Sequence, residues 1–387
     1  MPGRNRMVDQ LDLTDPEWEK AARAVPRELF VADGYFAADN SGQPTRYRPA
    51  TSADPHWLRD IYTDDSLVTQ LDGHLSPTDV HEPVEGIPTS SSTMPSLVLR
   101  MLQYLDVTDG MKVLEIGTAT GCSTALLCQR LGAANVASVE VDPAVALRAD
   151  NALEAAGFST WTVTGDGLVG FPHLAPYDRI IATCTVNRIP RAWIRQTRPG
   201  AVILATVGSW AYGTGLAKVT VREDGTAEGR IIGRSSFMTV RSQTPQAITG
   251  NLADRAAYAD SERPTPVSPH LLNEWTPAFL AQLAAPGVQK IPLVRADGTE
   301  TVYLFDTGRE SFAVLDGTGD GEWMVRQGGP VALWDDIERA LTAWQRHERP
   351  ELDQIHISIT AREHNYWIGG PVPDFGPSAL RWTHRLA

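Results

Sequence analysis

An apolar run that breaks into a glycine turn and resumes as a helix constrains the fold of this chain more than any other feature. The run is Val113-Leu114-Glu115-Ile116, the turn is Gly117-Thr118-Ala119-Thr120-Gly121, and helical apolar spacing begins after Cys122. This order predicts a strand, a tight turn and a helix. Glycines let backbone approach a ligand, and the free N–H groups that open a helix can hold a polar group. We therefore expect a cofactor-binding turn.

The residues of the turn favour S-adenosylmethionine over a dinucleotide. A dinucleotide fingerprint reads G-x-G-x-x-G, and the third glycine is absent here. Glu115 stands two residues before Gly117, where a carboxylate repels a pyrophosphate but suits the cationic amino-acid end of S-adenosylmethionine. An α/β turn without a cofactor remains the alternative for this motif alone.

A carboxylate at the end of the next strand adds to the predicted site. Residues 136–141 read as a buried strand, and Glu140 lies 19 residues after Gly121, where an acid accepts ribose hydroxyls in nucleotide-binding folds. A helix cap is the alternative role. Because Asp142 already fills that role before Pro143, ribose binding is favoured for Glu140.

A third acid follows the third predicted strand, over residues 160–164. Asp166 stands between Gly165 and Gly167, where its carboxylate can accept a hydrogen bond from the adenine amine. Asp-Gly is also common in plain turns, which leaves that alternative open.

Five consecutive hydroxyl side chains precede a proline that opens a predicted helix. They run from Thr89 to Thr93, and Pro95 begins a segment with apolar residues at helical spacing. One hydroxyl is enough to cap a helix N-terminus. Five in a row therefore leave spare hydroxyls beyond the one that a cap needs.

Strands alternate with helices up to residue 205, and two strands around a turn follow over 215–240. This pattern predicts an α/β fold, a doubly wound Rossmann-like sheet with antiparallel edge strands. Residues 38–60 read as loop. Residues 242–269 read as a linker, and 270–387 as a smaller α+β domain with a strand at 354–360. The expected domains are thus 1–241, with the cofactor site, and 270–387.

Charge and cysteine content exclude some classes of function. The 387-residue chain carries a net charge of −13, which argues against binding a nucleic-acid backbone, and an Asn-Pro-Pro-Tyr motif for a flipped base is absent. The three cysteines form no metal-binding pattern. We find no apolar run long enough for a membrane span and no signal-peptide core, so we expect a cytoplasmic protein without metal or membrane partners.

Seven segments resemble, in order and spacing, the protein-L-isoaspartate O-methyltransferases. The similarity covers roughly residues 14–240. The segments are Val25–Val31, Tyr62–Asp65, Ser91–Pro95, Val113–Ser123, Gly165–Gly167, Ala175–Asp178 and Gln196–Gly200.

This resemblance implies an S-adenosylmethionine-binding α/β domain that releases S-adenosylhomocysteine. It implies that Ser91, Ser92 and Thr93 belong to a segment that closes over the cofactor and the substrate carboxylate. It places Glu115, Gly117 and Gly121 at the methionine end of the cofactor. Glu140 would bind the ribose, and Asp166 with Gly167 the adenine. The complete cofactor-binding set is Glu115, Gly117, Thr118, Ala119, Gly121, Glu140, Val141, Asp166 and Gly167.

Departures from the family pattern bear on the substrate. Thr93 stands where the family has serine, Ser92 where it has isoleucine, and Cys122 where an aromatic residue is often found. With its added C-terminal domain, the chain looks more like variants that modify ribosomally synthesised peptides such as lasso peptides, lanthipeptides and graspetides. Those variants methylate a normal aspartate, and the ester cyclises to an aspartimide.

The expected function is therefore methylation of an aspartate carboxylate in a peptide. An ionised carboxylate needs no general base, because its pKa lies near 4. Repair of isoaspartate in damaged proteins is the alternative within the same enzyme class. A non-catalytic module that binds cofactor or peptide is the alternative of another class.

Overall fold

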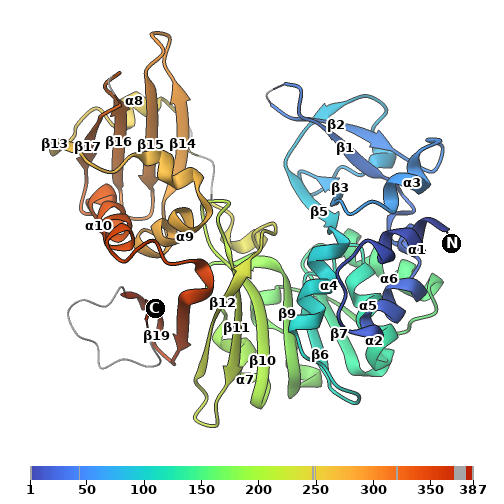
Figure 1. Ribbon diagram of the computed structural model, residues 1–387. Coiled ribbons are helices and arrows are strands. Elements are labelled where there is room, and N and C mark those ends of the chain that lie inside the picture. Colours follow the sequence, from blue (N-terminus) through green and yellow to red (C-terminus); the bar gives the residue numbers. More distant parts are fainter. Residues whose placement is uncertain are drawn as a thin grey trace. The chain divides into compact units, whose positions relative to one another are not determined.

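The computed structural model describes residues 2–385 except 43, 246, 247, 249, 320 and 370–380 (Figure 1). The chain divides into two compact units. Unit 1 comprises Met1–Cys184, Pro190–Leu204 and Thr220–Gly225, and unit 2 comprises Thr185–Ile189, Ala205–Val219 and Thr226–Ala387.

The first part of unit 1 contains a small antiparallel sheet with the strand order β4-β2-β1-β3-β5. Its strands are β1 (Tyr35–Asp39), β2 (Arg46–Ala50), β3 (Leu67–Leu71), β4 (Val84–Glu85) and β5 (Pro88–Ser92). The helices of this part are α1 (Pro2–Asp9), α2 (Pro16–Ala24), η1 (Arg27–Val31), α3 (Trp57–Ile61) and η2 (Pro77–Asp79).

The loop predicted over residues 38–60 is wrong, because this stretch contains the end of β1, all of β2 and α3. Strand β2 alternates between exposed and partly buried side chains and is fully buried only at Ala50. A strand covered on one face keeps polar residues on the other, and its composition then resembles that of a loop.

The cofactor-site half of unit 1 is built on parallel strands. Strand β6 pairs in parallel with β7 on one side and β9 on the other, and β8 pairs in parallel with β7. All residues of β6 and β7 are buried, as expected for central strands of a parallel sheet. The strands are β6 (Val113–Ile116), β7 (Val136–Glu140), β8 (Trp161–Thr164) and β9 (Tyr177–Val186).

Helices connect these strands. They are α4 (Pro95–Tyr104), α5 (Cys122–Leu131), η3 (Ala133–Asn135), α6 (Pro143–Ala155), η4 (Gly167–Val169), η5 (Pro172–Leu174) and α7 (Arg191–Arg195). The chain first adds β7 and β8 on one side of β6 and then returns to add β9 on the other. Ligands of doubly wound folds bind where the strand order reverses, at the carboxyl ends of the strands. Here that point is the end of β6.

The complete sheet has ten strands, in the order β20-β19-β18-β12-β11-β10-β9-β6-β7-β8. Its other strands are β10 (Thr197–Val207), β11 (Gly215–Val221), β12 (Ala227–Arg234), β18 (Ile355–Ile359), β19 (Glu363–Ile368) and β20 (Arg381–Arg385). The pairs β12–β18, β18–β19 and β19–β20 are antiparallel. The predicted doubly wound sheet with antiparallel edge strands is therefore confirmed.

Unit 2 also contains a second, antiparallel sheet, in the order β13-β17-β16-β15-β14. Its strands are β13 (Ser261–Thr265), β14 (Gln289–Val294), β15 (Glu300–Asp306), β16 (Ser311–Gly317) and β17 (Trp323–Gly328). The helices are η6 (Arg241–Gln243), α8 (Leu252–Arg255), η7 (Pro269–Asn273), α9 (Trp275–Ala284), α10 (Leu333–Arg346) and η8 (Leu352–Gln354).

Two sequence expectations for this region need correction. The predicted linker 242–269 includes β13, an edge strand that pairs along its whole length with β17. Pro264 lacks a backbone N–H, which an edge strand tolerates, and its presence made the segment resemble a linker. The strand predicted at 354–360 exists as β18, but it pairs with β12 rather than with the strands of the small sheet.

Candidate active site

The turn after β6 holds three residues in left-handed backbone conformations. The φ angles are +95° at Gly117, +48° at Ala119 and +86° at Gly121. A Cβ on Gly117 would lie 3.0 Å from Thr183 Oγ1. Glycine is therefore required at 117 by both conformation and space, and the backbone of the turn stays open to a ligand.

Glu115 lies fully buried in β6, next to this turn. Its Oε2 accepts hydrogen bonds from Thr124 Oγ1 at 2.5 Å and Ser138 Oγ at 2.9 Å. Burial raises the pKa of this carboxyl above its ordinary value. Its Oε1 is buried and has no hydrogen-bond partner within the described part of the chain. A buried acceptor without a partner fits a group that brings a donor or a positive charge.

Glu140, at the end of β7, is 8% exposed and holds the turn in place. Its Oε2 accepts from the Ala119 N–H at 2.9 Å, and its Oε1 accepts from the Asp142 N–H at 3.0 Å. A carboxylate has about four acceptor positions, so further hydroxyls can bind to the same oxygens. The next side chain, Val141, is 43% exposed and offers an apolar surface beside them.

Asp166 and Gly167 follow β8 and begin η4. Asp166 is exposed, and its Oδ1 accepts the Leu168 N–H at 2.9 Å. A Cβ on Gly167 would lie 2.4 Å from Ile116 Cγ2 at the end of β6. Glycine at 167 therefore lets the segment after β8 pack against the end of β6.

Cys184 lies among these acids, a feature that the sequence analysis missed. Burial is the main cause that raises the pKa of its thiol to about 12, and the negative charges of Glu140, Glu115 and Asp166 act in the same direction. Cys184 lies two residues after Ala182, the last residue of β9 that pairs in parallel with β6, and its Sγ lies 3.7 Å from the Ile116 carbonyl oxygen. The signal was available in principle, because the carboxyl ends of parallel strands share one edge of a sheet.

The predicted hydroxyl segment divides into side chains with different environments. Ser92 is 2% exposed and its Oγ accepts from Arg27 Nε at 3.3 Å. The hydroxyls of Ser91 and Thr93 lie in partly buried positions. Within the described ranges neither hydroxyl has an intramolecular hydrogen bond, and both are available to a ligand.

Arg27 organises this segment and was not predicted as a site residue. Its guanidinium is buried and donates to the backbone carbonyls of Ile61, Thr63, Asp65, Ser92 and Thr93 at 2.7 to 3.2 Å. Desolvation lowers the pKa of Arg27, and the largest opposing effect comes from Cys122, the first residue of α5.

Side-chain contacts also join β5 to the region of Glu140. Gln70 of β3 donates to Asp142 Oδ2 at 3.1 Å and accepts from Thr89 Oγ1 at 2.9 Å. A cavity of about 270 Å³ is lined by the turn residues Ala119 and Thr120, by Ser90 of β5 and by α6. The turn and the hydroxyl-bearing strand thus border a common space.

The structure also bears on metal sites and on membrane-spanning helices. Within the described ranges, no three His, Cys, Asp or Glu side chains come together in a way that could hold a metal ion. No helix in that part of the chain is long and apolar enough to cross a membrane.

A strand-turn-helix with acids at the ends of the next two strands is the arrangement expected for a nucleotide-cofactor site of the α/β methyltransferase class. Residues 76–244 match the family model described as protein-L-isoaspartate(D-aspartate) O-methyltransferase. The protein-L-isoaspartate O-methyltransferase of Pyrococcus horikoshii is 34% identical over 160 residues, which are 41% of this chain and 72% of the relative. That of Hyperthermus butylicus is 30% identical over 226 residues, 56% of this chain and 87% of the relative.

A solved protein-L-isoaspartate O-methyltransferase has the same fold. It superposes with a TM-score of 0.51 and 21% identity, covering 92% of this chain and 96% of the other. The chain belongs to the protein-L-isoaspartate O-methyltransferase family. Membership confirms the predicted enzyme class, an S-adenosylmethionine-dependent carboxyl methyltransferase, and the cofactor predicted with it.

Proposed function

We propose that this enzyme methylates the side-chain carboxylate of a normal aspartate in a ribosomally synthesised peptide, and that the ester then cyclises to an aspartimide. The observation that carries the proposal is the pair of available hydroxyls on Ser91 and Thr93, in a segment that departs from the family pattern. Domain 1–241 would transfer the methyl group, and domain 270–387 would help to recognise the peptide.

The residues around the turn fit S-adenosylmethionine, which supplies an electrophilic methyl group on a sulfonium. Glu115 Oε1 is a buried acceptor without a described partner, suited to the cationic methionine end. Glu140 retains acceptor positions for the ribose hydroxyls. Asp166, beside Gly167, can accept from the adenine amine, and Val141 offers apolar surface to the ring.

The hydroxyl segment would hold the substrate carboxylate. One carboxylate oxygen accepts hydrogen bonds from Thr93 and Ser91, while the other oxygen is left to attack the methyl carbon. Orientation of this kind lowers barriers by up to roughly 7–11 kcal/mol in ideal cases. Ser92 has a supporting role, because its Oγ is buried and bonded to Arg27.

Ring closure needs no further catalytic group on the enzyme. The carbonyl of a methyl ester is a better electrophile than a carboxylate. The backbone nitrogen of the following residue attacks this carbonyl, the C–N bond forms, and methanol leaves with the amide proton. The product is a succinimide, and its formation would be the downstream consequence of methylation.

Isoaspartate repair is the second candidate function. It is favoured by the names of the relatives, all protein-L-isoaspartate O-methyltransferases. The solved structure that covers 92% of this chain is also named a protein-L-isoaspartate O-methyltransferase, so the long C-terminal part alone does not favour either function. The departures from the family pattern favour the first candidate, because Thr93 adds a methyl group and Ser92 replaces an apolar residue in the segment proposed to hold the substrate.

Two synthetic peptides of identical sequence, one with aspartate and one with isoaspartate, separate the candidates. Each is incubated with enzyme and S-adenosylmethionine and followed by mass spectrometry. We expect the aspartyl peptide to gain one methylene and then to form a product one water lighter than the starting peptide. An asparagine peptide is the control and should stay unmodified.

Preferential methylation of the isoaspartyl peptide would establish repair instead. No methyl uptake by either peptide, with S-adenosylhomocysteine bound normally, would favour the non-catalytic binding module.

A further inference from the structure

The loop between α3 and β3, residues 62–66, bonds to the backbone of the hydroxyl segment. Ser66 Oγ accepts a hydrogen bond from the Met94 N–H at 3.0 Å, and Asp64 Oδ1 accepts from the Ser96 N–H at 2.8 Å. These acceptors stand 28 and 32 positions before their donors in the chain. The loop therefore holds the backbone that directly follows Thr93.

The peptide unit that joins Thr93 to Met94 is held at both of its polar ends. Its carbonyl oxygen accepts from Arg27 Nη2 at 3.2 Å, and its N–H donates to Ser66 Oγ. A peptide unit is planar, so contacts at its oxygen and its hydrogen fix the orientation of the plane. The rotamers open to a side chain depend on the backbone angles around it. Arg27 and Ser66 together thus restrict where the Thr93 hydroxyl can point.

Helix α4 is capped by a side chain from outside its own segment. Met94 occupies the N-cap position, and its side chain makes no capping hydrogen bond. A capping side chain accepts from a backbone N–H in the first turn of a helix. Asp64 does this through the Ser96 N–H. It therefore helps to fix the start of α4 at Pro95, two residues after Thr93.

Among the described residues, the first turn of α4 offers no free backbone N–H to a substrate carboxylate. The N–H groups of Met94 and Ser96 donate to the loop, and those of Leu97 and Val98 donate to the Met94 carbonyl at 3.2 Å. Pro95 has no N–H. A carboxylate bound at this segment therefore depends on side-chain hydroxyls, and their orientation matters.

We propose that Ser66 and Asp64 are positioning residues for methyl transfer. They hold the backbone after Thr93 so that its hydroxyl meets one carboxylate oxygen of the substrate, while the other oxygen faces the methyl carbon. In this role both residues act through Thr93. The inference rests on the substrate-binding role that the proposed function gives to Thr93, and it applies to an aspartyl and an isoaspartyl carboxylate alike.

Steady-state kinetics of the full-length variants S66A and D64A test the proposal. Each variant should lower kcat about tenfold at saturating S-adenosylmethionine, because a less restricted Thr93 spends less time in the productive geometry. D64N keeps an oxygen that can cap α4, so it should recover about half of the wild-type kcat or more. The affinity for S-adenosylhomocysteine should stay within about twofold in all three variants.

A double-mutant cycle separates positioning from a general loss of structure. Because both residues act through Thr93, S66A and D64A should lower kcat by less than about twofold when T93A is already present. A loss of about tenfold in the T93A background, equal to the loss in the wild-type background, overturns the proposal. Wild-type kcat in both S66A and D64A overturns it as well. Ser66 and Asp64 are exposed, and if D64A fails to fold, S66A decides alone.

The matched control is D65A, which removes an exposed acid from the same loop. The variant keeps the backbone carbonyl of residue 65, which accepts from Arg27 Nη2 at 2.9 Å. D65A should leave kcat within about twofold of the wild-type value. A loss as large as that in D64A would assign the effect to the whole loop and would contradict the role of the two acceptors.

The cycle is measured with the peptide that the wild-type enzyme methylates. Methylation of the isoaspartyl peptide alone overturns the proposed function, and the cycle on that peptide still decides the inference. Methylation of the aspartyl peptide together with independent losses in the cycle supports the proposed function and overturns the inference.

Discussion

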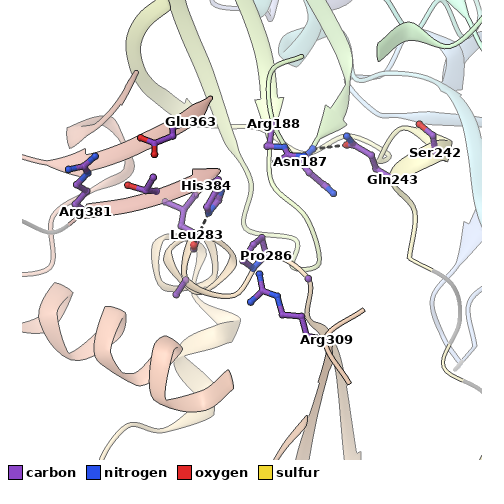
Figure 2. Close-up of a pocket in the computed structure, with 13 residues that line it drawn as sticks. Asn187, Arg188, Ser242, Gln243, Leu283, Pro286, Arg309, Glu363, Arg381 and His384 are labelled. Atoms are coloured by element: carbon purple, nitrogen blue, oxygen red, sulfur yellow. Dashed lines mark hydrogen bonds between the residues drawn. The ribbon is translucent and has the colours of Figure 1, made fainter. Parts of the chain in front are cut away.

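The turn of unit 1 and the pocket of unit 2 that Arg188, Arg309 and Arg381 help to line bring charges of opposite sign near a titratable side chain (Figure 2). Around the turn, the charges of Glu115, Glu140 and Asp166 all raise the pKa of the Cys184 thiol. Around the pocket, Arg188 and Arg309 act together on His384. The negative charges around the turn fit the sulfonium and the amino group of S-adenosylmethionine, whereas the positive charges around the pocket do not.

The arginines of the two units differ in what they bind. Arg27 is 3% exposed, and its guanidinium donates hydrogen bonds to five backbone carbonyls. Arg309 is half exposed and has one carboxylate neighbour at 3.5 Å. The first arginine therefore supports the fold of the hydroxyl segment, and the second remains able to bind a ligand.

Replacement of Arg27 by Met should have the largest effect. It leaves buried carbonyls without donors, and we expect the free energy of unfolding to fall by about 3–5 kcal/mol. The matched change R309M should cost about 0.5 kcal/mol or less. Urea unfolding of both variants measures the difference, and equal losses would remove the contrast between the two arginines.

Replacement of Glu140 by Ala should weaken binding of S-adenosylhomocysteine by about 2–3 kcal/mol, roughly 30- to 150-fold. The variant loses the acceptors proposed for the ribose and frees the Ala119 N–H. Glu154, an exposed acid on α6, supplies the control E154A. Calorimetry gives both affinities. An E140A variant that binds S-adenosylhomocysteine as tightly as E154A would exclude Glu140 from cofactor binding.

Replacement of Thr93 by Ala should lower kcat for the aspartyl peptide roughly 30-fold. The activation free energy rises by about 2 kcal/mol because a hydrogen bond to the charged carboxylate is lost. T93S keeps the hydroxyl and should retain most of the rate. Affinity for S-adenosylhomocysteine should not change in either variant. A T93A enzyme with wild-type kcat would exclude Thr93 from substrate binding.

The smallest predicted effect concerns His364 of β19, which is fully buried. Burial is the main cause that lowers its pKa to about 3, and the charge of Arg188 adds to it. Between about pH 6.5 and pH 3, His364 is therefore protonated in the unfolded chain and neutral in the folded chain. The free energy of unfolding is thus highest above pH 6.5 and falls as the pH decreases.

Between pH 6.5 and 5.5 this histidine alone should cost about 1 kcal/mol. H364L should remove that part of the pH dependence in urea unfolding at the two pH values. The control variant H347L replaces an exposed histidine and should leave that pH dependence unchanged. An unchanged slope in H364L would show that His364 accepts a proton in the folded state.

The central strands could be predicted from the sequence because their signal is local. Strands β6 and β7 are continuous buried runs, and glycines mark the turn between strand and helix. The acids of the candidate site were found for the same reason, since Glu140 ends β7 and Asp166 lies two residues after the end of β8. Strand β2, with alternating exposure, and β13, with Pro264 at an edge, carry no such signal.

Features that depend on distant parts of the chain could not be predicted. Arg27 was noticed only within a similar segment, because its role comes from carbonyls between residues 61 and 93. The pairing of β18 with β12 joins residues more than one hundred positions apart. The pocket brings Arg188 together with Arg309 and Arg381, which are 309 − 188 = 121 and 381 − 188 = 193 positions away. Local patterns contain no information on such contacts.

A crystal structure of the full-length enzyme with S-adenosylhomocysteine tests the central claim most directly. The account predicts the ribose hydroxyls on Glu140, the amino group near Glu115 and the sulfur on the side of Thr93. Density for the ligand at another place, or a turn between Gly117 and Gly121 closed by protein atoms, would contradict it.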